Sequence, residues 1–178
     1  PGIWTVYHAI DKGVPDAFQQ QQALHYIQKQ IPHIPVQAEG LPHEDLELVS
    51  TTNWQPYTWS VNNVALAENL NTALAFWQGG NPEAGYKLFE SALVESMYLG
   101  ASPGGFQQLS FYDAIRGELY RDFADPIGGA SRALVEGLFG IQPNLLEHKL
   151  KIKPGFPEEW DHANLNLPDL DVAFKKTG

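Results

Sequence analysis

Residues that can carry out acid/base chemistry are concentrated between Ser110 and Asp125, in the segment SFYDAIRGELYRDFAD. Acid/base catalysis of bond cleavage often uses two carboxyl groups, one as an acid and the other as a base or nucleophile. We take Glu118 and Asp122 as the candidate catalytic residues. Three neighbouring polar residues, Asp113, Arg116 and Arg121, are candidate substrate-binding residues. The guanidinium of an arginine can keep a nearby carboxylate ionised or bind a hydroxyl group of a ligand.

The same segment also has structural explanations. Asp125 is better explained as a helix cap than as a catalytic group, because Pro126 follows it at a position suited to the first helical residue. Its carboxylate can accept hydrogen bonds from the free N–H groups of the first turn. Asp113, Glu118, Asp122 and the two arginines could equally form structural ion pairs. The residue types alone leave both explanations open.

Aromatic side chains gather in a second segment, NWQPYTW at 53–59. Aromatic faces stack on apolar faces of a ligand, and the polar tips of Trp and Tyr form hydrogen bonds, which suits a sugar ring. Packing of the rings beneath the loops is the alternative, and we expect it for some of them. The candidate substrate-binding residues are Trp54, Gln55, Tyr57 and Trp59, together with Tyr112 from the first segment.

Helices must hold these two segments in place. Apolar residues recurring at spacings of three and four predict helices at 15–30, 60–78, 82–98 and 126–139. The apolar run 3–10 is either a strand or the end of a helix. Long loops at 33–59 and 101–124 alternate with a tight turn at Gly79 and Gly80, which makes 60–78 and 82–98 an antiparallel hairpin. We therefore expect both long loops at one end of parallel helices 60–78 and 126–139, where they would line a single cleft.

Polar residues on helix 60–78 divide into two groups. Asn62 and Asn63 lie in its predicted first turn, close to the expected cleft. Glu68 and Asn69 lie further along and are expected to form hydrogen bonds between helices.

After residue 142 the apolar period changes from 3.6 to 2. Leu146, Leu150 and Ile152 alternate with charged residues, and a second alternation follows from Leu165 to Phe174. Alternation of this kind predicts half-buried strands. We divide the chain into a helical segment, 1–142, and a small antiparallel β unit, 143–178. Two or three short strands are marginally stable alone, so they must pack on the helices or on a sheet outside this chain.

Composition excludes several classes of function. The net charge of −10 over 178 residues disfavours nucleic acid and anionic membranes as partners, because both need a basic surface. There is no cysteine and hence no disulfide or thiolate site. The six histidines show no metal-ligand spacing, so we predict neither a metal nor a cofactor. No apolar run is long enough to insert as a transmembrane helix.

Three stretches together resemble the C-terminal part of bacterial α/α-toroid (six-hairpin) glycoside hydrolases. They are TTNWQPYTWSVNNVALAEN, MYLGASPGGFQQLSFYDAIRGELYRDFADPIGGASRALVEGLFG and LKIKPGFPEEW. The chain is most similar to a bacterial domain family of unknown function that is associated with polysaccharide degradation. RGELYRDFADPIG and the GLFGI stretch followed by Pro143 are the most specific pieces.

The resemblance implies a mainly α fold, in which helical hairpins form part of a toroid before the β strands begin. It implies a glycan partner, a periplasmic or extracellular location, and further hairpins outside this chain. Alternatively, the exposed helix faces would self-associate. The function expected is glycoside hydrolysis of a polysaccharide or oligosaccharide. The alternatives are a glycan-binding domain without turnover, and a helical-repeat interaction module, suggested by the small and aromatic residues of NTALAFWQGGNPEAGYKLFESAL.

Overall fold

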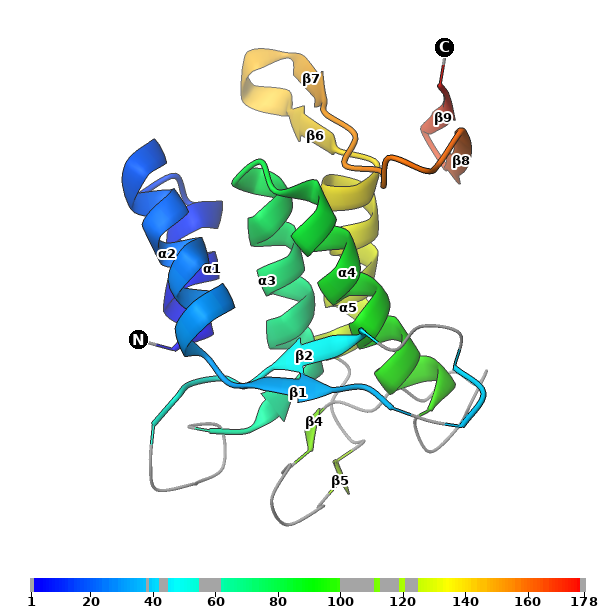
Figure 1. The fold of residues 1–178 in the computed structure, drawn as a ribbon. Coiled ribbons are helices and arrows are strands. Elements are labelled where there is room, and N and C mark those ends of the chain that lie inside the picture. Colours follow the sequence, from blue (N-terminus) through cyan, green and yellow to red (C-terminus); the bar gives the residue numbers. More distant parts are fainter. Residues whose placement is uncertain are drawn as a thin grey trace.

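The computed structural model describes residues 2–37, 39–41, 45–54, 62–99, 111–112, 119–120 and 125–176. Within these residues the helices form two groups that stand side by side (Figure 1). One group contains α1 (Ile3–Asp11) and α2 (Ala17–Gln30), and the other contains α3 (Leu66–Gln78), α4 (Pro82–Leu93) and α5 (Asp125–Arg132). A π-helical turn extends α4 over Val94–Tyr98, and another extends α5 over Ala133–Leu138.

Short strands occupy both ends of the helices. At the end where α1, α3 and α5 begin, β1 (His33–Pro35) pairs with β2 (Glu47–Val49), and β3 (Val64–Ala65), β4 (Phe111–Tyr112) and β5 (Leu119–Tyr120) form a second sheet (Figure 1). At the other end lie two hairpins. β6 (Ile141–Asn144) pairs with β7 (Lys149–Ile152), and β8 (His162–Leu167) pairs with β9 (Leu170–Lys175). All the described pairings are antiparallel.

The predicted mainly α fold of helical hairpins from a toroid is wrong. The described residues form a mixed structure of five α-helices and nine short strands in four small antiparallel sheets. Five of these strands lie before residue 142, in stretches predicted to be loops or the start of a helix. They are two or three residues long, too short to show an alternating pattern, and the first of them ends at Pro35.

The helix ends follow recognisable capping chemistry. Asp16 caps α2 in a reciprocal capping box with Gln19. The side chain of Asn81 caps α4 at the backbone N–H of Ala84. The expected helix 60–78 starts later, at Leu66, because Val64 and Ala65 belong to strand β3. The expected helix 126–139 starts one residue earlier, at Asp125.

Helices α3 and α5 run in the same direction, as predicted. Near the start of both helices, a Cβ built on Gly129 would lie 3.4 Å from Leu70. Near the end of both, a Cβ on Gly137 would lie 2.2 Å from the ring of Trp77. The two helices therefore touch along their length, and glycines in α5 and its π-helical turn allow the close approach.

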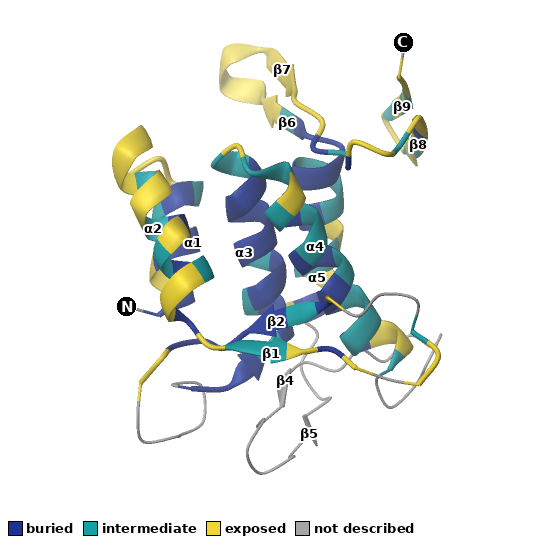
Figure 2. Ribbon diagram, viewed as in Figure 1, coloured by how far each residue is buried: buried dark blue, intermediate teal, exposed yellow. Residues whose placement is uncertain are grey.

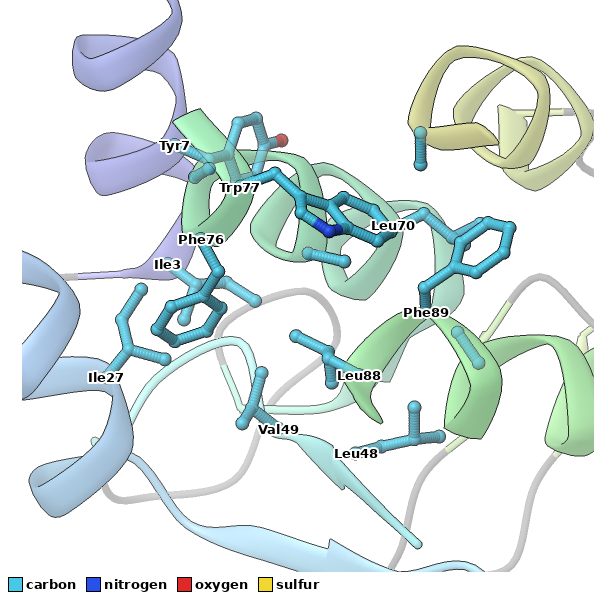
Figure 3. Packing of buried hydrophobic residues seen from close by; sticks show 14 of the residues in the cluster. Ile3, Tyr7, Ile27, Leu48, Val49, Leu70, Phe76, Trp77, Leu88 and Phe89 are labelled. Carbon is cyan, nitrogen blue, oxygen red and sulfur yellow. The ribbon is translucent and has the colours of Figure 1, made fainter. Parts of the chain in front are cut away.

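The apolar core fills the space between α3 and its neighbours. α3 is buried along most of its length, whereas α1, α2 and α4 are buried on one side (Figure 2). Side chains from α1, α2, α3, α4 and β2 point toward one another in this core (Figure 3). Trp77, at the end of α3, packs edge-to-face against Phe89. Nε1 of Trp77 donates to the carbonyl of Gly155 at 2.9 Å.

The two C-terminal hairpins differ in how they pack. Phe174 of β9 contacts Phe156, and Phe156 also packs on Trp160 and Phe139. The β8–β9 hairpin therefore packs against an aromatic cluster. The β6–β7 hairpin buries Ile141 at its start but leaves its other apolar side chains exposed, with Leu146 96% exposed. The half-buried strand predicted at 146–152 is therefore wrong. This stretch contains the end of a short 3-10 turn and then β7, and all four residues of β7 are exposed.

An ion-pair network joins α1 to the end of α5. Arg132 donates to Asp11, and it also binds both oxygens of Glu136 at 3.0 Å. Burial alone would raise the pKa of Asp11, but hydrogen bonds from Arg132, Lys12 and Gln78 outweigh it and lower the pKa to about 2. A carboxyl whose pKa is depressed by folding stabilises the folded state above its unfolded pKa.

We expect Asp11→Asn to lower the free energy of unfolding by about 1 kcal/mol at pH 7, a modest value because Arg132 is partly exposed. In the unsubstituted protein this contribution should disappear as the pH falls from about 4 to about 2. Urea titrations at pH 7 and at pH 2.5 measure it. The difference between the two proteins should be largest at pH 7 and clearly smaller at pH 2.5; an equal difference at both pH values would contradict the assignment.

Candidate active site

A carboxyl group in the first turn of α3 contacts the middle of α1. Glu68 is half-buried, and its Oε2 accepts a hydrogen bond from the hydroxyl group of the buried Tyr7. The exposed His8 lies beside Tyr7, with ring centroids 4.5 Å apart. The interhelical hydrogen bond expected for Glu68 is therefore present, and its partner comes from the apolar run whose structure the sequence left undecided.

The environment of Glu68 favours its protonated form. Burial raises the pKa of Glu68, and the negative charge of Asp125 raises it further, against the hydrogen bond from Tyr7 and the charge of His8. The pKa of Tyr7 is also raised, first by burial and then by its hydrogen bond to Glu68, so the phenol remains a donor. A raised pKa lets a carboxyl group keep its proton to higher pH, which is the change that a general acid needs.

A second carboxyl group, Asp125, lies near enough to interact electrostatically with Glu68. It is the first residue of α5, at the end of the molecule where α3 also begins. Asp125 is exposed on one side, yet partial burial raises its pKa, against a hydrogen bond from its own backbone. Two carboxyl groups with different solvent access thus lie at the start of two parallel helices that contact each other.

A layer of buried polar side chains lies at the same end of the helices. The hydroxyl of Ser50 donates to Oδ1 of Asn62 at 2.6 Å, and the backbone N–H of Asn63 donates to the hydroxyl of Thr51 at 3.0 Å. Asn69 joins β2 to α3 by exchanging hydrogen bonds with Val49 and donating to the carbonyl of Ala65. These bonds fix the backbone of 49–54 against the first turn of α3.

Trp54 extends from this rigid layer into solvent. The side-chain amide of Asn62 donates to the carbonyl of Trp54 at 2.7 Å. The backbone N–H of Trp54 donates to the hydroxyl of Thr52 at 3.1 Å. The side chain of Trp54 is nevertheless 52% exposed. An exposed indole on a fixed backbone is the arrangement that a stacking surface for a sugar ring needs.

The two segments expected to form one cleft do meet. β3, which follows the 53–59 segment in the chain, pairs with β4, which lies in the 110–125 segment, and Val64 lies opposite Tyr112. Because the side-chain amide of Asn62 also donates to the carbonyl of Trp54, one side-chain hydrogen bond and one strand pairing connect Trp54 with the strand that contains Tyr112. The predicted proximity of the two segments is confirmed for the described residues near Trp54 and Tyr112. The single cleft that they were expected to line stays a prediction.

Most residues predicted for the site lie outside the part of the chain that the structure describes. This holds for both candidate catalytic residues, Glu118 and Asp122, and for Gln55, Tyr57, Trp59, Asp113, Arg116 and Arg121. Trp54 is described in full, and Tyr112 through its strand. The roles assigned to these residues remain predictions.

Sequence reasoning missed the pairing of Tyr7 with Glu68. The two residues are 61 positions apart, so no local spacing connects them. One signal was present: Ile3, Tyr7 and Ile10 are separated by four and three residues, which is the spacing of one helix face. Assigning 3–10 to a helix would have put Tyr7 on its buried face.

No protein-family model and no curated protein matches this chain. The resemblance to glycoside hydrolases therefore remains a prediction from the quoted motifs. Among the described residues, no cluster of three or more His, Asp or Glu side chains is arranged to hold a metal ion. Within the same residues, none of the helices combines the length and apolar character that crossing a bilayer requires.

Proposed function

We propose that this protein acts on carbohydrates and cleaves glycosidic bonds, with Glu68 as the general acid and a carboxylate from 118–125 as its partner. The observation that carries the proposal is the environment of Glu68, which is partly desolvated, bonded to Tyr7 and close to Asp125. Glycoside hydrolysis needs one carboxyl group that holds a proton and a second that is ionised. The more exposed Asp125 is the described candidate for the second role, and Glu118 and Asp122 are the candidates predicted from sequence.

Trp54 supports a carbohydrate as the substrate. Its ring is exposed and its backbone is fixed at the end of the molecule where Glu68 and Asp125 lie. Aromatic stacking supplies affinity for the apolar face of a sugar, and carboxyl groups at the same end of the molecule can accept hydrogen bonds from its hydroxyl groups. Binding and acid/base chemistry would thus share one surface.

Incubation with a panel of plant and host polysaccharides and oligosaccharides tests the proposal, with release of reducing ends as the readout. At least one glycan should be hydrolysed by the unsubstituted protein, and Glu68→Gln should abolish that release. Hydrolysis that persists at the full rate in Glu68→Gln would show that Glu68 is structural.

The exposed Trp54 also supports a second candidate function, glycan binding without turnover. The same panel distinguishes the two. A binding domain would retain a glycan on an affinity gel and lose it on Trp54→Ala, while no glycan releases reducing ends. Loss of one stacked ring should cost about 1–3 kcal/mol of binding free energy, by analogy with bases stacked on aromatic side chains.

A further inference from the structure

A cavity of about 510 Å³ lies between the ends of α1 and α3, the starts of α2 and α4, the π-helical turn after α5, and the β6–β7 hairpin. The hairpin stands at the end of the helices opposite to β1 and β2 (Figure 1). Glu68 lies in the first turn of α3, whereas Gln78, which lines the cavity, is the last residue of that helix. The two residues are about 15 Å apart along the helix axis. The cavity is therefore separate from the Glu68 site, and its volume is within the range of small-molecule sites.

Several polar groups in the wall of this cavity are accessible to solvent. Lys151 and Lys153 are exposed, and Gln20 and Gln142 are half-buried. They come from α2 on one side and from the hairpin on the other. A ligand that enters the cavity can therefore contact these four side chains directly, without moving any buried residue.

The register of the hairpin places three of these side chains on one face. Gln142 lies opposite Lys151, and Lys153 follows two residues later. The backbone N–H of Lys153 donates to the carbonyl of Gly140 at 3.0 Å, which continues the pairing beyond β7. Because side chains alternate along a strand, Gln142, Lys151 and Lys153 share a face, and all three line the cavity. This face of the hairpin presents one amide and two ammonium groups to the cavity.

The two lysines that line the cavity differ from the third lysine of the hairpin. Nζ of Lys149 lies 2.8 Å from Oε2 of Glu147, so its charge is compensated. Lys151 and Lys153 form no ion pair within the part of the chain that the structure describes. Two uncompensated positive charges thus stand next to each other in a protein whose net charge is −10.

Two carboxylates, Asp11 and Glu136, also line the cavity and would repel an anion by themselves. Both are bound by Arg132, and Nζ of Lys12 lies 2.9 Å from Asp11. These two cations offset the two carboxylates. The charges of the hairpin lysines therefore remain as an excess of positive charge at the cavity, which favours an anionic ligand.

Gln20 provides a neutral polar group on the wall formed by α2. Its Nε2 lies near the end of α3, where a Cβ built on Gly79 would be 3.5 Å away. The side-chain amide of Gln20 makes no hydrogen bond to any other described residue. The amide of Gln142 donates to the carbonyl of Glu136 at 3.4 Å and keeps its own oxygen as an acceptor. Amides both donate and accept, which suits the hydroxyl groups of a ligand.

We propose that this cavity binds a small anion that also carries hydroxyl groups. The ammonium groups of Lys151 and Lys153 bind its carboxylate or phosphate by charge-assisted hydrogen bonds, and the amides of Gln20 and Gln142 bind its hydroxyl groups. A sugar acid and a sugar phosphate share this chemistry. The inference does not depend on the catalytic role proposed for Glu68.

Glucuronate and glucose 6-phosphate are suitable probes, and glucose is the matched neutral compound. Isothermal titration calorimetry should show binding of at least one of the two anions, at least about tenfold tighter than that of glucose. Binding of glucuronate alone would assign the site to sugar acids, and binding of glucose 6-phosphate alone would assign it to sugar phosphates. If neither anion binds at millimolar concentration, or if glucose binds as tightly as the anions, the proposal is wrong.

Nuclear magnetic resonance places the bound probe within the molecule. The amide resonances of Gln20 and Lys151 come from opposite walls of the cavity, so both should shift when the anion binds. The indole N–H resonance of Trp54, at the other end of the molecule, should stay in place. Shifts confined to the hairpin lysines would indicate an anion held only as a surface counter-ion and would overturn the cavity assignment.

Three substitutions on the same hairpin separate a specific contact from general charge. Lys151→Gln and Lys153→Gln should each weaken binding of the responding anion about tenfold, because each removes one charged hydrogen bond. Lys149→Gln removes the same charge from the same face, but Lys149 does not line the cavity, so the affinity should change less than about twofold. All three lysines are exposed, and the variants should fold. Equal losses in all three variants would contradict the proposed site.

Discussion

Replacing Glu68 by glutamine should lower glycan hydrolysis about 100- to 10,000-fold, which is the usual contribution of a positioned general acid. Glutamine has the shape of glutamate and can still accept the hydrogen bond from Tyr7, so only the transferable proton is removed. The effect should fall on kcat, with KM little changed, because the proton is needed in the transition state and not for substrate binding.

Stability provides the control for this substitution. Burial raises the pKa of Glu68, so ionising this group above its unfolded pKa costs the folded state free energy. Glutamine removes that cost, and the free energy of unfolding at pH 7 should be equal or higher in Glu68→Gln. A variant that loses activity and also loses stability would indicate a structural role for Glu68.

The other carboxyl groups can be ranked by the same assay. Asp125→Asn, Glu118→Gln and Asp122→Asn each keep the shape of the side chain and remove its charge. One of the three should reduce kcat as strongly as Glu68→Gln, and it is then the second catalytic carboxylate. If all three hydrolyse at the unsubstituted rate while Glu68→Gln is inactive, the acid/base pair proposed for this end of the molecule is wrong.

Tyr7→Phe separates positioning from proton transfer. Without the phenol hydroxyl, Glu68 loses a hydrogen bond that holds its pKa down, so its pKa should rise further. The acidic limb of the pH profile should change little, and the basic limb, where the general acid loses its proton, should move to higher pH. An unshifted basic limb would mean that Glu68 is not the group titrating there.

The long helices were predictable because their apolar residues recur over several turns. Helix α4 begins at the predicted position, since Asn81 and Pro82 are strong start signals, but it ends at Leu93, and a π-helical turn covers the rest of the predicted helix to Tyr98. The π-helical turns at 94–98 and 133–138 were not predicted, because the apolar spacing of three and four continues through them. The strands before residue 142 were missed because two or three residues carry no period.

The candidate site was only partly predictable for a related reason. The meeting of β3 with β4 follows from the alternation of long loops and tight turns, a feature that can be counted in the sequence. The contacts of Glu68 depend on how far α1 rotates about its axis, which packing decides through Ile3, Val6 and Ile10. Likewise, His33 faces Glu47 only because of the register between β1 and β2, which the residues between the strands do not specify.

Gly140→Ala should destabilise the protein strongly, because both backbone strain and steric overlap oppose a side chain at this position. Gly140 ends the helical segment with a φ of +67°, and a Cβ built on it would lie 1.8 Å from the carbonyl oxygen of Lys153. Neither atom can move easily, because the N–H of Lys153 donates to the carbonyl of Gly140 at 3.0 Å and Gly155 binds Leu138 in the same way. The left-handed conformation costs about 1–2 kcal/mol for alanine, and the overlap adds about 1–3 kcal/mol.

Gly80→Ala is the matched control for this prediction. Gly80 has a φ of +80°, but a Cβ there would meet no atom within 4 Å. It should therefore show the conformational cost of about 1–2 kcal/mol without the overlap. Urea denaturation of the two variants measures the difference directly. If Gly140→Ala is no less stable than Gly80→Ala, the backbone of Lys153, just after β7, does not pack against Gly140 as described. The β6–β7 hairpin would then be attached to the helices less tightly than its hydrogen bonds indicate.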